Sequence, residues 1–409
     1  MNKILFSIYT GEYPNQFAGG PNNIIYKTIK FFNKSGYKFD FLSSDLFAKN
    51  VTADSLDKLD ENLSKKKKTA FFLANNSQLY RKFFGSDFYL PYHFYKKNKY
   101  FKLFGNKKTE YNIIHCQDSV TLSLISNNSS AKKIMTIHSK GPLSDELRNT
   151  FQNIKLKQRI DKKLKKIEHK NINMADLITF PSMAAKNYFE ESLNISIPKE
   201  KIKIIYNGIE FDKIQNITGN DILERYLIDS KGVFTLLNIA AHGKEKNIDI
   251  LLRTVKFLKD KYKKNVLLIN VGVGNDTKEL QELTKKLNIS DSVKFLGKLP
   301  NEDVIKLLKA TDMFIMTSEK VIFDLVVLEA LACGACCVVS DEGGNKEIIK
   351  DGENGYLIDI NDIEGIAKKI ISIDRNRVKG KAIETARQFS VQKMVDGYFE
   401  MYESLLNGV

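Results

Sequence analysis

Short runs of β-branched and aliphatic residues alternate along this chain with longer amphipathic segments, and this alternation restricts its fold most. The first run, NKILFSIYT, is followed by PNNIIYKTIKFFNKSG, which has apolar residues at helical spacing, and then by YKFDFLSS. Such an order is typical of strand, helix and strand. Similar short runs return at YNIIHCQD, KKIMTIHSK, ADLITFPS, KIKIIYNG, VFTLLNIAA, NVLLINVGVG, SVKFLG, DMFIMTS and ACCVVSD. Repeated strand–helix units predict an α/β protein with parallel sheets.

The chain has 409 residues, which is long for one ordinary domain. A polar stretch near residues 207–220 separates two series of predicted strands. We therefore expect two doubly wound, Rossmann-like domains with a cleft between them, and a helix near the C-terminus from Ser390 to Leu406. Ligands of doubly wound sheets bind beyond the carboxyl ends of the strands, so the candidate site residues are sought in the loops that follow the strands.

The charge balance favours anionic partners. There are 64 Lys and Arg residues against 49 Asp and Glu, a formal net charge of +15, which attracts nucleic acid, anionic lipid or phosphorylated small molecules. The segment 50–108 mixes aromatic residues with lysines, a mixture that nucleic-acid readers also use. No reader motif accompanies it, and we expect no nucleic-acid partner.

A basic amphipathic helix is predicted over residues 156–171. Its apolar stripe consists of Leu156, Ile160, Leu164 and Ile167. Such a helix either packs its stripe on the domain or lies on an anionic membrane surface. The basic N-terminal half is thus a candidate for membrane contact. No run reaches the roughly 18 uninterrupted apolar residues of a membrane span, so we expect a cytoplasmic protein, or one peripheral at the inner face of the plasma membrane.

The four cysteines are Cys116, Cys333, Cys336 and Cys337. So few cysteines fit a reducing compartment. The CGACC run superficially suggests metal ligands, but no paired Cys or His cluster accompanies it. We expect small buried core thiols and no metal site.

A lone carboxylate, Glu329, lies in the apolar run VIFDLVVLEALACGACCVV, residues 321–339. On a helix, its neighbours one turn away are Leu325, Val326, Ala332 and Cys333, so its own face offers no base. A carboxylate beside a ligand can accept hydrogen bonds from two vicinal hydroxyls. The alternative is a helix-end Glu that reaches a backbone N–H group or solvent.

Together these segments resemble the retaining glycosyltransferases of the group 1 type (family 4), which have the GT-B architecture. The resemblance covers nearly the whole chain and is strongest from Val233 to Asp359. Its carriers are FAGGPNNIIYKTIKFF, IMTIHSK, ADLITFPS, IIYNGIE, LINVGVG, VKFLGKLPNEDVIKLLKATDMFIMTS and LVVLEALACGACCVVSDEGGNKEIIKDGENGYLI. The resemblance implies an N-terminal acceptor-side domain, 1–207, a C-terminal nucleotide-sugar-binding domain, 208–389, and a helix, 390–409, that crosses back to the first domain.

The implied reaction moves a hexose or N-acetylhexosamine from a nucleoside diphosphate sugar, with a UDP-sugar favoured. The implied acceptor is a glycan or lipid-linked glycan in surface polysaccharide or glycoconjugate synthesis. No cofactor is implied. Charge neutralisation by a lysine substitutes for a metal, because no DxD-like carboxylate pair stands out.

The resemblance also assigns roles to residues. His138 faces the donor sugar and the reacting centre, Lys246 neutralises the leaving diphosphate with Lys244 as a nearby competitor, and Glu329 holds the nucleotide ribose. His138, Lys246 and Glu329 are thus the predicted catalytic residues. For His138 a purely structural role is the alternative.

Further predicted contacts to the nucleotide sugar come from loops. Gly19 and Gly20 precede the first long helix, where backbone N–H groups can face a diphosphate, although a plain turn also explains a Gly-Gly pair. Gly272 and Gly274 would allow close approach of the nucleotide. The remaining predicted contacts are Leu296, whose backbone can read a base edge, and His242, Glu319, Phe323, Asp324 and Leu325.

The chain departs from the family pattern at two places. Members usually carry a glutamate eight residues before the position of Glu329, followed by Phe-Gly, whereas this chain has Val321 and Asp324. Either Asp324 or Glu319 could supply the missing acceptor, and Asp324 is equally suited to cap the helix.

The second departure is the loss of an arginine that usually lies a few residues before the lysine at 246. Ala240, Ala241 and His242 occupy that loop here, and only His242 could replace part of the charge. These losses motivate an alternative function, a non-catalytic GT-B subunit that partners another transferase. A nucleotide-sugar epimerase on the same fold is a further alternative.

Overall fold

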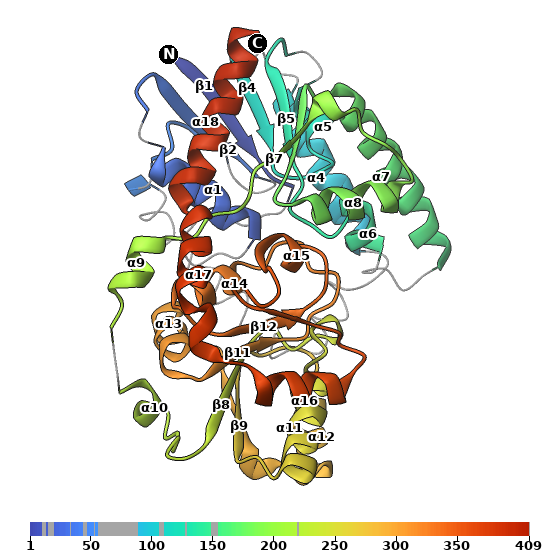
Figure 1. The fold of residues 1–409 in the computed structure, drawn as a ribbon. Helices are drawn as coiled ribbons and strands as arrows, with labels where there is room; N and C mark the ends of the chain where they lie inside the picture. Colours follow the sequence, from blue (N-terminus) through green and yellow to red (C-terminus); the bar gives the residue numbers. More distant parts are fainter. Residues whose placement is uncertain are drawn as a thin grey trace. The chain divides into compact units, whose positions relative to one another are not determined.

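A computed structural model describes the chain at residues 1–9, 14, 20–32, 34–43, 47–52, 54–55, 89–105, 110–126, 129–148, 154–218 and 221–408. The chain divides into two compact units, one formed by Met1–Tyr206 with Met394–Val409 and the other by Asn207–Lys393. Each unit has its own sheet with helices packed around it (Figure 1). Two sheet-centred α/β units are what the strand–helix alternation predicts.

The first unit contains a seven-stranded sheet in the order β3-β2-β1-β4-β5-β6-β7. All neighbouring strands are parallel except β2 and β3. Its strands are β1 (Asn2–Ser7), β2 (Tyr37–Leu42), β3 (Phe47–Ala48), β4 (Ile113–Cys116), β5 (Lys132–Thr136), β6 (Leu177–Phe180) and β7 (Ile202–Ile204). Its helices are α1 (Gly20–Phe31), α4 (Tyr89–Gly105), α5 (Leu122–Ile125), α6 (Leu143–Arg148), α7 (Ile154–Met174), α8 (Met183–Leu193) and most of α18 (Val391–Asn407).

The second unit contains a six-stranded, wholly parallel sheet in the order β10-β9-β8-β11-β12-β13. Its strands are β8 (Phe234–Ile239), β9 (Val266–Val271), β10 (Val293–Gly297), β11 (Met313–Met316), β12 (Cys337–Ser340) and β13 (Tyr356–Ile358). Its helices are α9 (Phe211–Asn216), α10 (Ile222–Arg225), α11 (Ile248–Tyr262), α12 (Thr277–Lys286), α13 (Asn301–Ala310), α14 (Leu325–Ala332), α15 (Asn345–Ile348), α16 (Ile363–Ser372) and α17 (Arg375–Gln388).

The sheet of the second unit is buried on both faces. Consecutive residues of one strand belong to different hydrophobic clusters: Leu236 packs with α11 and α16, whereas Leu237 packs with α13 and α14. Alternation of this kind follows from the two-residue repeat of a strand. Burial of both faces explains why the strands read as continuous apolar runs.

The C-terminal helix contributes to the core of the first unit. Tyr398 and Tyr402 of α18 are almost fully buried, and the Tyr402 hydroxyl lies 2.8 Å from His115 Nδ1. His115 Nε2 lies 2.6 Å from Thr136 Oγ1. Burial lowers the pKa of His115 from 6.5 to about 3, so the imidazole is neutral at neutral pH.

The basic helix α7 packs its apolar stripe on its own unit. Ile160 and Leu164 are buried, and Ile167 is half-buried; the side chain of Leu156 lies outside the described residues. Packing on the domain, one of the two predicted outcomes, is therefore confirmed for these side chains. Among the helices of the described ranges, none is both long enough and apolar enough to span a bilayer.

Glu168 on α7 is a buried carboxyl group. Its Oε1 accepts hydrogen bonds from Ser119 Oγ at 2.6 Å and from the Ser144 backbone N–H at 3.1 Å. Its Oε2 is also buried, and no described residue forms a hydrogen bond with it. Burial raises the pKa of Glu168 from 4.5 to about 7.

This raised pKa makes stability depend on pH. Between pH 4.5 and about 7 the folded chain binds a proton at Glu168 that the unfolded chain lacks. The contribution of this proton to the stability of the fold is therefore complete below pH 4.5 and is lost as the pH rises to about 7. Glu168→Gln removes this dependence. We therefore expect the unfolding free energy of the variant, minus that of the wild type, to increase by roughly 2 to 3 kcal/mol from about pH 5 to about pH 8.

Urea unfolding at the two pH values measures this difference. The matched control is Glu191→Gln, which removes an exposed carboxylate from α8 and is expected to show no pH-dependent difference from the wild type. A Glu168→Gln difference that is the same at both pH values would contradict the prediction.

Candidate functional site

The chain order in the second sheet reverses between two neighbouring strands. From β8 the chain proceeds to β9 and β10 on one side, and then to β11, β12 and β13 on the other. Ligands of open α/β sheets bind beyond the carboxyl ends of the strands at such a switch point. The loops in question follow β8, at 240–247, and β11, at 317–324. They contain the predicted residues His242, Lys244, Lys246, Glu319, Phe323 and Asp324.

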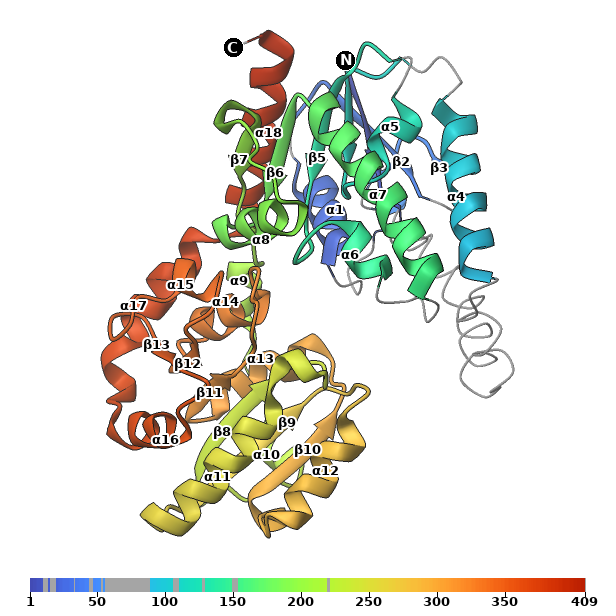
Figure 2. The same cartoon turned by 90° about the vertical axis from the view of Figure 1, so that its right-hand side faces the viewer.

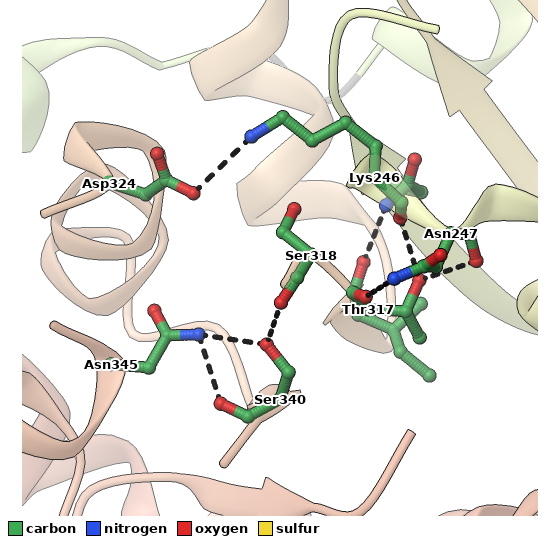
Figure 3. Close-up of polar contacts among 9 residues, drawn as sticks. Lys246, Asn247, Thr317, Ser318, Asp324, Ser340 and Asn345 are labelled. Atoms are coloured by element: carbon green, nitrogen blue, oxygen red, sulfur yellow. Dashed lines mark hydrogen bonds and ion pairs between the residues drawn. The ribbon is translucent and has the colours of Figure 1, made fainter. Parts of the chain in front are cut away.

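Lys246 and Asp324 face each other across these two loops. Lys246 Nζ lies 3.7 Å from Asp324 Oδ2, and the two side chains are 20% and 29% exposed (Figure 3). Lys244 is exposed to solvent. Of the two candidate lysines, Lys246 is therefore the one that is turned towards a neighbouring side chain at the switch point.

Asp324 occupies the N-cap position of α14, but its side chain makes no capping hydrogen bond. Its Oδ2 is buried and has no hydrogen-bond partner in the described part of the chain. Of the two roles considered for Asp324, a side-chain helix cap is excluded in this structure. The carboxylate instead forms the ion pair with Lys246.

Hydrogen bonds fix the positions of the two loops. Thr317 Oγ1 donates to the carbonyl oxygens of Lys246, at 3.1 Å, and Asn247, at 2.9 Å. The Glu319 backbone N–H donates to the Glu245 carbonyl at 2.9 Å. The Glu319 bond joins backbone atoms of the two loops, whereas the Thr317 hydroxyl joins a side chain to backbone carbonyls, as Figure 3 shows around Thr317. Together they hold the two loops that carry Lys246 and Asp324 in position.

The end of β12 and the start of α15 add polar groups that the sequence did not single out. Ser340 Oγ donates to the Ser318 carbonyl, and Asn345 Nδ2 donates to the Ser340 carbonyl at 3.0 Å (Figure 3). Ser318 Oγ and Asn345 Oδ1 are buried, and within the described ranges neither has a hydrogen-bond partner. Their only sequence signal was their position just after a strand, which many structural residues share.

Gly272 and Gly274 allow two loops of the protein to approach each other. A Cβ atom on Gly272, which has φ +132°, would lie 1.9 Å from the Ala240 carbonyl oxygen, and one on Gly274 would lie 2.3 Å from the His242 carbonyl oxygen. The sequence pattern predicted that the nucleotide lies next to these glycines. In the structure, the backbone of the loop that carries Lys246 occupies the space next to the Cα atoms of these glycines.

His242 is the residue that could replace part of the charge of the missing arginine. The side chain is buried, and Nδ1 lies 2.8 Å from Thr277 Oγ1. Burial lowers its pKa below the usual value. The imidazole is therefore neutral at neutral pH, and the charge of the missing arginine is not replaced at this position.

Glu329 has a protein partner that its own helix did not reveal. The side chain is half-buried, and Oε1 accepts a hydrogen bond at 3.2 Å from Nδ2 of Asn301, the first residue of α13. This amide is a partner that the residues on its own helix did not indicate, and the contact of Glu329 with the nucleotide ribose stays a prediction. Val321 is 2% exposed and belongs to the core, so no acceptor replaces the family glutamate there.

Three of the predicted contacts lie against the core of the second unit. The ring of Phe323 packs against Phe389, with centroids 5.6 Å apart. Leu296 and Leu325 are partly buried against the same cluster. In this structure their side chains serve packing, so a contact with a nucleotide would have to come from their backbone groups.

The remaining predicted residues lie in the first unit. His138 follows β5, and its Nε2 lies 2.6 Å from Gln117 Oε1. Burial lowers the pKa of His138 from 6.5 to about 4, so the ring is neutral at neutral pH, with Nε2–H donating to Gln117. Gly20 is the first residue of α1, and Gly19 lies outside the described residues.

The cysteines agree with the expectation of core thiols. All four are free; Cys116, Cys336 and Cys337 are buried and Cys333 is half-buried. Burial raises the pKa of each thiol. In the part of the chain that the structure describes, no group of three His, Cys, Asp or Glu side chains is placed to hold a metal ion.

Comparison with known proteins identifies the family. The family model for glycosyl transferases group 1 matches residues 225–390, and the model for glycosyltransferase family 4 matches residues 18–213. The chain is 31% identical over 286 residues to an uncharacterized glycosyltransferase from Methanocaldococcus jannaschii, an alignment that covers 68% of this chain and 70% of that protein. The chain therefore belongs to the group 1 glycosyltransferase family.

Two further proteins are similar to this chain. It is 30% identical over 241 residues to N-acetyl-alpha-D-glucosaminyl L-malate synthase from Bacillus anthracis, covering 58% of this chain and only 61% of that enzyme. The chain also resembles the crystal structure of Anabaena Alr3699/HepE in complex with UDP. The superposition covers 98% of this chain and 100% of the HepE chain, with a TM-score of 0.67 and 20% identity. This structural likeness confirms the predicted GT-B architecture of two Rossmann-like α/β units.

Proposed function

We propose that this protein is a retaining, metal-independent glycosyltransferase. It moves a hexose or N-acetylhexosamine from a nucleoside diphosphate sugar, with a UDP-sugar favoured, to a glycan or lipid-linked acceptor in surface polysaccharide or glycoconjugate synthesis. The observation that carries the proposal is Lys246 at the switch point of the second sheet, in a chain of this family. The relative from B. anthracis is named for an N-acetylglucosaminyl product, and HepE was crystallised with UDP, which supports the proposed donor class.

In this proposal the donor binds at the loops that follow β8 and β11. Lys246 stabilises the charge that develops on the departing diphosphate, a role for which a preorganised cation is well suited. Glu329 accepts hydrogen bonds from the ribose hydroxyls, and the Asn301 amide, 3.2 Å from its Oε1, orients the carboxylate. Loop backbone groups complete the diphosphate site.

The proposed chemistry is a front-face substitution. The bond between the sugar C1 and the diphosphate oxygen breaks, and the acceptor oxygen forms its bond to C1 on the same face. The acceptor proton passes to the departing phosphate oxygen, so no enzyme nucleophile is needed. The neutral His138 belongs to the first unit and is assigned to the sugar as a hydrogen-bonding group.

Thermal stabilisation across the diphosphates of uridine, guanosine and thymidine and their common sugars tests this function. A ligand at about a hundred times its dissociation constant adds roughly 2.7 kcal/mol to the stability of the form that binds it. We expect a shift with one nucleotide series, followed by sugar transfer in the presence of a chelator, with the anomeric configuration kept in the product. If no donor shifts the melting temperature of protein that has a native circular dichroism spectrum, the proposal is excluded.

A second candidate function, the non-catalytic GT-B subunit, is favoured by one observation. Val321, where the family has a sugar-binding glutamate, is buried in the core and cannot contact a ligand. A subunit of this kind would bind a partner transferase or an acceptor and would show weak or no donor binding. Saturable binding of a nucleotide sugar would exclude it.

We also propose that the first unit contacts anionic lipid at a groove between α4 and α7. The two helices lie side by side in Figure 2, with α5 between them. The groove has a volume of about 300 Å³ and is lined by Asn98, Lys99, Lys102, Leu103, Leu124, Lys163 and Ile167. Leu103 is 56% exposed. An apolar floor with exposed lysines around it suits an acyl chain and an anionic headgroup.

Vesicle cosedimentation measures this contact. We expect the full chain to bind vesicles that contain phosphatidylglycerol, and the triple variant Lys99→Gln/Lys102→Gln/Lys163→Gln to bind about a hundredfold more weakly, since each lysine near an anionic surface contributes about 1 kcal/mol. The matched control replaces Lys278, Lys285 and Lys286, which are exposed on α12 of the second unit, and is expected to bind nearly as the wild type does. Equal losses in the two triple variants would place the contact elsewhere.

A further inference from the structure

Asp324 combines two properties at the donor site. It is the ion-pair partner of Lys246, and its Oδ2 is buried without a hydrogen-bond donor among the residues that the structure describes. We infer that Asp324 makes this site distinguish a nucleoside diphosphate that carries its sugar from the free nucleoside diphosphate, and that it disfavours the free form. This inference rests on the proposed function, because it concerns the same donor site.

The first reason is electrostatic. In the described part of the chain, Asp324 is the one carboxylate that forms an ion pair with Lys246. A diphosphate placed against Lys246 therefore brings its negative charge next to a carboxylate that already neutralises the lysine. The interaction between two like charges a few ångströms apart is unfavourable, and partial burial weakens the screening by water.

The second reason concerns hydrogen bonds. An ionised carboxylate only accepts hydrogen bonds, and so do the oxygens of an ionised phosphate. A free, ionised diphosphate can therefore donate no hydrogen bond to Asp324 Oδ2. A sugar hydroxyl is a donor, and a hydrogen bond to a buried ionised acceptor is a strong one. The transferred sugar can thus offset the repulsion that the diphosphate alone would meet.

The consequence concerns both ends of the reaction cycle. A donor that arrives with its sugar satisfies Asp324 and is retained. After transfer the sugar has left with the acceptor, so the remaining nucleoside diphosphate again faces an unsatisfied carboxylate next to its phosphates. Asp324 thereby weakens binding of the product and favours its release. Val321 cannot share this role, because it is buried in the core.

Calorimetric titration of the full chain tests the inference. The probes are UDP, inorganic diphosphate, and the three sugars UDP-glucose, UDP-galactose and UDP-N-acetylglucosamine. For Asp324→Asn we expect UDP and inorganic diphosphate to bind about threefold to tenfold more tightly, because a partly screened like charge has been removed. The affinity of the preferred UDP-sugar is expected to change less or to fall, so the preference for the sugar-bearing form decreases.

The matched control is Asp341→Asn, which removes one exposed negative charge from the loop after β12 and is expected to leave this preference unchanged. Unchanged or weaker UDP binding in Asp324→Asn overturns the inference, and so does an equal effect of the two variants. If the wild type binds inorganic diphosphate but neither UDP nor a UDP-sugar, the inference about Asp324 and the proposed use of a UDP-sugar donor both fail. UDP-sugar binding without a change of preference overturns the inference alone.

Discussion

Gly272→Ala is expected to destabilise the second unit by about 3 kcal/mol, since overpacking and an unfavourable backbone conformation add up at this position. Gly272 has φ +132°, and a Cβ atom would lie 1.9 Å from the Ala240 carbonyl oxygen. This neighbour is backbone, so no side-chain rotation can relieve the clash. Guanidinium unfolding, followed by circular dichroism, measures the loss.

The control for this substitution is Gly297→Ala. Gly297 also has a positive φ, +71°, but a Cβ atom there would have no neighbour within 4 Å among the described residues. Only the cost of the left-handed backbone remains, about 1 kcal/mol. Equal destabilisation by the two variants would mean that the loop around Ala240 moves freely, which would contradict the close approach described above.

Lys246→Met is expected to lower the rate of sugar transfer by about a hundredfold to a thousandfold, the usual effect of removing one preorganised group that stabilises transition-state charge. The loss has two causes. The departing diphosphate loses its cation, and Asp324, 3.7 Å from the lysine in the wild type, loses its counter-ion next to the phosphates. Steady-state kinetics with the donor selected by thermal stabilisation measures the effect.

Lys244→Met is the comparison variant for Lys246→Met. It removes the same charge two residues away, from a side chain that is exposed to solvent, and we expect a loss of about threefold or less because water screens exposed charges. Similar losses in the two variants would show that general charge at this loop matters and that the position of Lys246 does not.

The sequence was sufficient to place the strands and most of the loops. Each of the short apolar runs forms a strand of the structure, because parallel strands buried on both faces need continuous apolar residues. The strands that were missed are β3 and β13. β3 has two residues, too few for a repeat of two to show, and β13 has three. Neither lies at the switch point, so the loops there could be located without them.

The contacts within the site were less accessible to sequence reasoning. The hydrogen bond from Asn301 to Glu329 joins residues of two helices that are 28 positions apart in the sequence, and helical periodicity reports only neighbours on one helix. The burial of His242 and the loop contact of Gly272 depend on how the loops after β8 and β9 pack. The family resemblance supplied the positions of Glu329 and His242 but not their surroundings, and it did not indicate Asn301.

The contact of His115 with Tyr402 has a consequence for biosynthesis. These residues belong to one unit but are separated by 287 positions, and all of the second unit lies between them. A ribosome therefore delivers the complete second unit before the tyrosine that pairs with His115. Domains tend to fold as they emerge, yet here the half that is made first must wait for the last residues of the chain. Until then its buried histidine lacks this partner. The first half must therefore avoid aggregation in an incomplete form while the second unit is being synthesised.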